Sequence, residues 1–170
     1  TGSKEWEADG IYVCSGSDFE TLYPQLYAGV PITKCKLQMM RMMAQPGNYR
    51  IGPAICGSLS LIHYNAFKAA SSLKELNERY KLEYKDFLDW GIHVMASQNK
   101  AGELTVGDSH EYGLTPDPFD RQFINQLILD YLEKFARFKD ERIIESWNGI
   151  YSKLTNGQTH LVIEPEQGVT

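Results

Sequence analysis

The sequence predicts an α+β fold, in which an antiparallel or mixed β-sheet carries two main helices packed on one of its faces. Several short runs alternate apolar and polar residues with the period of two that a half-buried strand requires. Turn-forming sequences such as Asn99–Gly102 join neighbouring runs, as in hairpins. Two other segments have apolar residues at helical spacing, so strands outnumber helices.

Seven runs are predicted as strands. The longest starts at Thr33 and carries little charge on one face, and the run after the turn at 45–48 is expected to return antiparallel to it, with Gly57 as a candidate bulge. The turn at Asn156-Gly157 is expected to join the last two runs. The predicted strands are 11–14, 33–43, 55–64, 91–98, 103–106, 142–151 and 159–163.

Each of the two helices has a start signal. Ser72 and Glu75 fit a capping box, although the first helix could begin as early as Asn65. For the second helix, Asp117 suits the N-cap and Pro118 the first helical position. The apolar face expected for it comprises Phe119, Phe123, Leu127, Ile128, Tyr131, Leu132 and Phe135.

Composition excludes several functional classes. With 170 residues and 42% apolar content, the chain can bury one core, which makes it one domain or most of one. A net charge of −5 without a basic stripe argues against nucleic acid as a partner. No apolar run reaches the ~20 residues that span a bilayer, and no signal peptide is visible, so we expect no membrane partner and a cytoplasmic location. Three cysteines without CxxC spacing favour buried, reduced thiols, with a structural zinc site or a catalytic thiol as the alternatives.

Both ends of the sequence suggest a piece of a longer protein. The chain opens in a strand-like run at Asp9–Ile11 and stops at Glu166–Thr170 without a capping element. A domain usually ties its termini down or lets them trail off. We therefore expect a fragment.

The most informative stretch follows the strand that ends at Gly107. Asp108, Ser109, His110, Glu111 and Tyr112 form a row of polar side chains that a pocket could use. His110 and Glu111 could be an oriented acid–base pair, but neighbours on a strand point to opposite faces, and a solvated strand end is the alternative. No residue stands out as a strong base or nucleophile, so no catalytic side chain is predicted.

The histidines do not indicate a metal site. His63, His93, His110 and His160 lack HxH or HExxH spacing, so no metal ligand is predicted. His93 lies in the middle of a predicted strand, where a hydrogen-bonded core histidine is the plain interpretation.

A second cue is the segment from Trp147 to Tyr151. On a strand these two aromatic residues share one face, with Gly149 between them. The glycine would let a ligand ring or another strand approach the backbone closely, and core aromatic packing is the alternative.

Four segments together resemble the glycine oxidase and D-amino acid oxidase superfamily of FAD-dependent oxidoreductases, and within it a bacterial branch associated with phosphonate breakdown. The run from Gly107 to Gly113 is the most specific, and the match extends over nearly the whole chain. The segments are Asp9–Gly16, Cys35–Arg41, Ile92–Met95 continuing through Gly107–Gly113, and Trp147–Tyr151.

The resemblance implies a domain layout and a cofactor. Residues 1–30 would be a short segment of a flavin-binding domain. Residues 31–154 would be the substrate-binding domain, and 155–170 the start of the segment that returns to the flavin-binding domain. The Gly-x-Gly-x-x-Gly motif of the family is absent from the sequence, so FAD would be held by the complete protein and not by this chain alone. The partners of this chain would be a small amine substrate and the remaining flavin-binding part of the same protein.

The resemblance also implies the site residues. Ser15, Gly16 and Gly149 would lie near the cofactor. The substrate would be bound by His93, His110, Glu111, Trp147 and Tyr151. Tyr151 stands where relatives have an arginine that grips the substrate carboxylate, which puts an ordinary amino acid in doubt and favours a phosphonate or another anionic head group.

The function implied is oxidation of a small amine, an amino acid or aminophosphonate, by hydride transfer to flavin. His93, His110 and Tyr151 should then point into one cavity. Two alternatives from other classes are a stand-alone small-molecule binding module and a dimerisation or interaction domain, both without redox activity.

Overall fold

The computed structural model describes residues 4–170, which form two compact units. The larger unit is Cys35–Ile150, and the smaller one combines the chain up to Lys34 with Tyr151–Thr170. The predicted substrate domain, 31–154, overlaps the larger unit. Its role, and the assignment of 1–30 and 155–170 to a flavin-binding domain, stay predictions; residues 1–3 of the first piece lie outside the described residues.

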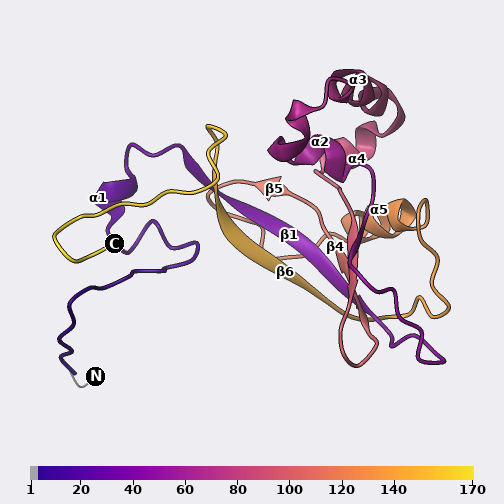
Figure 1. Cartoon of the computed structure of the whole chain (residues 1–170), viewed down its shortest axis with the longest axis horizontal. Coiled ribbons are helices and arrows are strands. Elements are labelled where there is room, and N and C mark those ends of the chain that lie inside the picture. The colour runs from indigo at the N-terminus through magenta and orange to yellow at the C-terminus, as the bar shows by residue number, and fades with distance from the viewer. Residues whose placement is uncertain (1–3) are drawn as a thin grey trace. The chain divides into compact units, whose positions relative to one another are not determined.

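Figure 1 shows the order of the elements along the chain. They are α1 (Pro24–Tyr27), β1 (Ile32–Met42), β2 (Ile55–Cys56), α2 (Ser60–His63), the 3₁₀ helix η1 (Asn65–Ala69), α3 (Leu73–Glu83), α4 (Lys85–Asp89), β3 (Met95–Gln98), β4 (Leu104–Gly107), β5 (Glu111–Tyr112), α5 (Gln122–Leu132) and β6 (Ile143–Leu154).

The strands form one six-stranded sheet in the order β2-β3-β4-β1-β5, and β6 also pairs with β1. β1 is antiparallel to both β4 and β5, and β3 is antiparallel to both β2 and β4. Together with the helices, this mostly antiparallel sheet confirms the predicted α+β fold.

The register gives the sheet two distinct faces. Met40, Val106 and Ala96 lie side by side on β1, β4 and β3, and all three are buried. One residue along each strand, Met39 lies beside Gly107 on the opposite face. Side chains alternate along a strand, so these residues mark two faces of the sheet. We call the face that carries Met40 the core face and the face that carries Met39 the open face.

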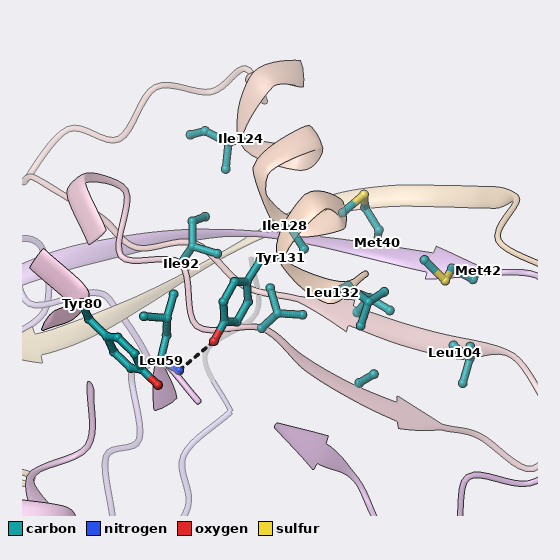
Figure 2. Packing of buried hydrophobic residues seen from close by; sticks show 13 residues of the cluster. Met40, Met42, Leu59, Tyr80, Ile92, Leu104, Ile124, Ile128, Tyr131 and Leu132 are labelled. Carbon is teal, nitrogen blue, oxygen red and sulfur yellow. Dashed lines mark hydrogen bonds between the residues drawn. The ribbon is translucent and has the colours of Figure 1, made fainter. Parts of the chain in front are cut away.

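Two main helices cover the core face. α3 contributes Tyr80, and α5 contributes Ile124, Ile128, Tyr131 and Leu132 (Figure 2). The side chains of Met40, Met42, Leu104 and Val106 rise from the sheet to meet them. Each fully buried aliphatic side chain adds about 1.5–3 kcal/mol of apolar burial, so this cluster holds the larger unit together.

Several predicted strands are wrong in extent or partner. The run predicted at 55–64 pairs for only two residues, and its partner is β3 instead of β1. At Gly57 the chain leaves the sheet and turns into α2, with the Ser60 N–H donating to the Gly57 carbonyl at 3.0 Å. The strand predicted at 91–98 begins only at Met95, because the Ile92 N–H donates to the Phe87 carbonyl of α4.

The terminal strands are also wrong. Of the run predicted at 11–14, only Ile11 forms an isolated bridge, with Val169. Residues 159–163 form no strand. The hairpin of β3 and β4 and the long strands β1 and β6 are confirmed.

One of the two predicted helix starts is confirmed. Ser72 is the N-cap residue of α3, although it makes no side-chain capping hydrogen bond. α5 begins at Gln122, not at Pro118, because the segment before it is bonded to β1 instead. The Lys36 ammonium donates to the carbonyls of Asp117 and Phe119, and the Arg121 N–H donates to Gln38 Oε1 at 2.9 Å.

Replacing Tyr131 with phenylalanine should destabilise the larger unit. The Tyr131 hydroxyl accepts the Leu59 N–H at 2.8 Å (Figure 2), and its side chain is 2% exposed. Tyr131→Phe leaves that buried N–H without an acceptor, which costs about 1–3 kcal/mol. Urea denaturation measures the change, and Tyr12→Phe, at a tyrosine that is 79% exposed, is the control and should be neutral. Equal stability of the two variants would contradict the role of this hydrogen bond.

Candidate functional site

Three imidazoles from separate segments form a cluster in the larger unit. The rings of His93 and His110 are stacked, with centroids 4.8 Å apart and an interplanar angle of 25°. The ring of His63 lies 3.8 Å from His93 and 4.5 Å from His110. One nitrogen from each ring lies within 4.8 Å of the others. We call these residues the three-histidine cluster.

Local structure brings each histidine to this place. His63 is the last residue of α2, and His93 precedes Val94 and Met95 at the entry to β3. Since Val94 belongs to the core cluster, alternation turns His93 toward the open face. The His110 N–H donates to the Trp90 carbonyl at 2.9 Å, which ties the segment between β4 and β5 to the end of α4.

Two of the imidazoles have defined neighbours at one ring nitrogen. His110 Nδ1 lies 2.9 Å from the Gly91 carbonyl, and a carbonyl only accepts, so Nδ1 donates this hydrogen bond. His93 Nε2 lies 3.4 Å from Asp108 Oδ1. His93, Asp108 and His110 are all buried, whereas His63 is partly exposed.

Tyr64 completes the surroundings of the cluster. Its ring stands edge-on to His93 with centroids 5.3 Å apart, and its hydroxyl lies 3.8 Å from the Met95 sulfur. Burial raises the pKa of Tyr64, and the charges of Asp108 and then Cys56 raise the pKa further. Tyr64 is therefore a neutral hydrogen-bonding group at any physiological pH.

Glu111 has a different neighbour from the one considered in the sequence. It pairs across the sheet with Lys36, and its carboxylate lies 3.5 Å from Arg121 Nε. The carboxylate beside the cluster is that of Asp108, two residues before His110 and three before Glu111. The substrate-binding role of Glu111 stays a prediction.

Lys36 lies on the core face, where the contacts of its ammonium group stabilise the fold. It is 1% exposed, and its ammonium reaches two backbone carbonyls and, at 3.3 Å, the Asp120 carboxylate. These three acceptors match the three N–H donors of the ammonium. Arg41 is the cation of the open face, where its Nη1 lies 2.9 Å from Glu145 Oε2.

Trp147 and Gly149 pack against β1. The Arg41 guanidinium lies 5.5 Å from the centre of the Trp147 ring. A Cβ at Gly149 would lie 3.3 Å from Leu37 Cδ1, so the group that approaches this glycine is a side chain of the neighbouring strand. Their roles toward substrate and cofactor stay predictions.

The other predicted site residues belong to the smaller unit. Ser15 Oγ donates to the Asp18 carbonyl at 3.0 Å, and Gly16 adopts a positive φ of 65° and accepts a hydrogen bond from Ser152 Oγ at 3.2 Å. Tyr151 lies in β6 and is 37% exposed. The convergence of Tyr151 with His93 and His110 stays a prediction.

A pocket of about 520 Å³ lies beside α2 and α5. It is wide enough for a small organic ligand, since ligand pockets usually occupy roughly 300–1,000 Å³. Tyr64 contributes to both this pocket and the surroundings of the three-histidine cluster. Other lining residues are Cys56, Tyr84, Tyr131, Lys134 and Phe135.

The residues present do not form a complete FAD site. The sequence lacks the Gly-x-Gly-x-x-Gly loop that cradles a pyrophosphate. Ser15 and Gly16 are engaged in a turn, and the space over Gly149 is taken by Leu37. Any FAD would need binding groups beyond those of this chain.

Among solved structures, the chain is similar to part of a glycine oxidase from Geobacillus kaustophilus, with a TM-score of 0.51 and 14% sequence identity. The match covers 95% of this chain and 35% of that chain, so this chain spans about a third of the length of the glycine oxidase. No protein-family model and no curated protein matches. The likeness shows the fold alone.

Among the helices within residues 4–170, none is both long and apolar enough to cross a bilayer.

His63 is the member of the cluster that sequence reasoning missed. It falls in the run predicted as a strand at 55–64, where its side chain had no evident neighbour. Its Leu61-Ile62-His63-Tyr64 context gave no spacing signal toward His93 or His110. The bulge suggested at Gly57 was the nearest hint, because it marked where the strand ends.

Replacing Asp108 with asparagine should lower the pKa of Tyr64. The Asp108 charge opposes ionisation of this phenol, so Asp108→Asn moves its pKa downward toward the ordinary value near 10. NMR titration of labelled tyrosine measures the shift, and the resonance lost in Tyr64→Phe assigns it. An unchanged midpoint would show that the carboxylate does not act on Tyr64.

Proposed function

We propose that this chain is the substrate-binding part of a FAD-dependent oxidoreductase that oxidises a small amine by hydride transfer to flavin. The observation that carries the proposal is the fold, which matches part of a glycine oxidase over 95% of this chain. The remaining flavin-binding part of the same protein is the proposed partner, since this chain has no pyrophosphate cradle of its own. A bound flavin would supply the hydride acceptor.

The proposed contribution of this chain is to bind and orient the amine. Asp108 and the neighbouring imidazoles place a carboxylate and neutral hydrogen-bonding groups together in a largely buried setting. A carboxylate attracts the ammonium form of an amine, and low solvent access strengthens that attraction. Binding the amine in this way requires no side chain that acts as a strong base.

The proposed substrate class is an amino acid or an aminophosphonate. Tyr151 offers a phenol where the resembled family has an arginine, and a phenol cannot form the bidentate ion pair that a carboxylate prefers. A phosphonate accepts single hydrogen bonds from phenol and imidazole groups. This favours the aminophosphonate.

The test uses the intact natural protein. Its visible spectrum should show bound flavin, and anaerobic addition of an aminophosphonate or amino acid should bleach that spectrum. Hydrogen peroxide or reduction of an artificial acceptor then reports turnover. A protein that binds no FAD, or whose flavin no amine reduces, would exclude this function.

The pocket of about 520 Å³ favours a second candidate, a small-molecule binding module without redox activity. Its aromatic lining with the nearby Lys134 suits an anionic aromatic ligand. Ligand binding by the flavin-free intact protein, with no flavin requirement, would favour this candidate over the oxidoreductase.

Tyr151→Phe in the intact enzyme should raise KM for the amine. Loss of one hydrogen bond to the head group costs about 1 kcal/mol, which corresponds to roughly a fivefold change. Steady-state kinetics measures it, with Tyr12→Phe as the control at an exposed tyrosine. Wild-type kinetics for Tyr151→Phe would remove this residue from the site.

A further inference from the structure

We propose that His63, His93 and His110 form a binding site for a divalent transition-metal ion, with zinc as the probe. The site shares its imidazoles with the proposed amine-binding site, but metal binding needs neither flavin nor substrate. It rests on the convergence of three imidazoles that lie 30 and 17 residues apart in the sequence.

The nitrogen positions are close to those of a coordinated ion. One nitrogen from each ring lies within 4.8 Å of the other two. Zinc binds imidazole nitrogen at about 2.0–2.1 Å, so three tetrahedral ligand atoms lie about 3.3 Å apart. The remaining gap is about 1.5 Å or less. His63 is partly exposed and ends the four-residue helix α2, so its side chain can rotate relative to the other two rings.

The neighbours of the rings suit metal binding. A ligating histidine usually donates its other ring N–H to a carbonyl or carboxylate, which fixes the tautomer and orients the ring. His110 donates from Nδ1 to the Gly91 carbonyl at 2.9 Å. His93 has Asp108 Oδ1 3.4 Å from its Nε2. Two of the three histidines therefore have an outer partner of the expected kind.

The carboxylate beside the cluster suits a cation. Asp108 Oδ1 lies 3.4 Å from His93 Nε2, so negative charge stands next to the converging imidazoles. Imidazole ligands with a carboxylate nearby are a combination that binds transition-metal cations.

The ligand set indicates the kind of ion. Three imidazoles suit zinc, copper, nickel or cobalt and disfavour magnesium and calcium, which prefer oxygen. Three protein ligands leave a fourth coordination position open in tetrahedral geometry. Water, the Asp108 carboxylate or the head group of a small molecule can fill it.

The experiment is calorimetric titration of the chelator-treated intact protein with Zn²⁺. We expect one ion per chain. His63→Ala removes one ligand and should weaken binding by at least the ~10–100-fold that loss of an outer partner costs. His160→Ala is the matched control, because His160 is the fourth histidine, is exposed and lies outside the cluster.

X-ray absorption at the zinc edge of the unsubstituted protein identifies the ligands without any variant. Nitrogen and oxygen ligands with an imidazole signature are expected. Sulfur ligands would assign binding to the exposed thiols Cys14 or Cys56 and overturn the proposal. Absence of stoichiometric zinc binding would also overturn the proposal. So would equal zinc affinity in the folded His63→Ala and His160→Ala variants. Should His63→Ala unfold by circular dichroism, His63→Gln takes its place.

Because the titration contains no amine and follows no turnover, its outcome is independent of the proposed oxidation. An active oxidase that binds no zinc would retain the proposed function and lose this site. A zinc-binding protein without amine oxidation would do the reverse.

Discussion

The arrangement of the larger unit depends on the pairing of β1 with β4. The register that sets Met40 beside Val106 and Met39 beside Gly107 decides which side chains enter the core and which lie on the open face. A slip of one residue would exchange the two sets and expose the buried methionines. The same register extends through β4 to β3, whose first residue, Met95, follows His93 by two positions.

Buried polar groups on β1 add a second constraint. Lys36 and Gln38 lie on the core face beyond the hydrophobic cluster, and both are almost fully buried. Their donors and acceptors are used by the segment before α5 and by the start of α5 itself. Lys36 bonds to two carbonyls of the segment, and Gln38 Nε2 donates to Asn125 Oδ1 of the helix at 2.7 Å. An unpaired buried ammonium would be costly, so the position of that segment and of the first turn of α5 is tied to β1.

Sequence patterns predicted what depends on local periodicity. β1, β6, the hairpin of β3 and β4, and the presence of α3 and α5 follow from spacing within single segments. The apolar face predicted for α5 is wrong in part: Phe119, Phe123 and Phe135 are exposed, and Ile124 is buried instead. The start of α5 could not be predicted in this way, because Lys36 and Gln38 act on it from more than 80 residues away. The short β2 also depends on a distant contact, since the side of Gly57 is closed by the rings of Tyr131 and Phe135.

The same limit applies to the candidate site. His93 and His110 could be singled out because they flank a recognisable hairpin, and the structure brings their rings together. His63 could not, because its place depends on where β2 ends and α2 begins. Likewise, the aromatic and glycine pattern at Trp147–Tyr151 fitted a ligand contact and strand packing equally well, and only the coordinates show that Leu37 approaches Gly149.

The three-histidine cluster links the two proposals through one chemical question, which is what the imidazoles present to a small molecule. Without a metal, His110 has Nε2 as an acceptor and His93 has Asp108 at hand, a combination suited to an ammonium group. With a metal, the lone pairs are used and the cluster instead offers an open coordination position, which attracts anionic oxygens. A phosphonate head group fits the second state better than the first. The metal state of the cluster would therefore decide which end of an aminophosphonate it binds.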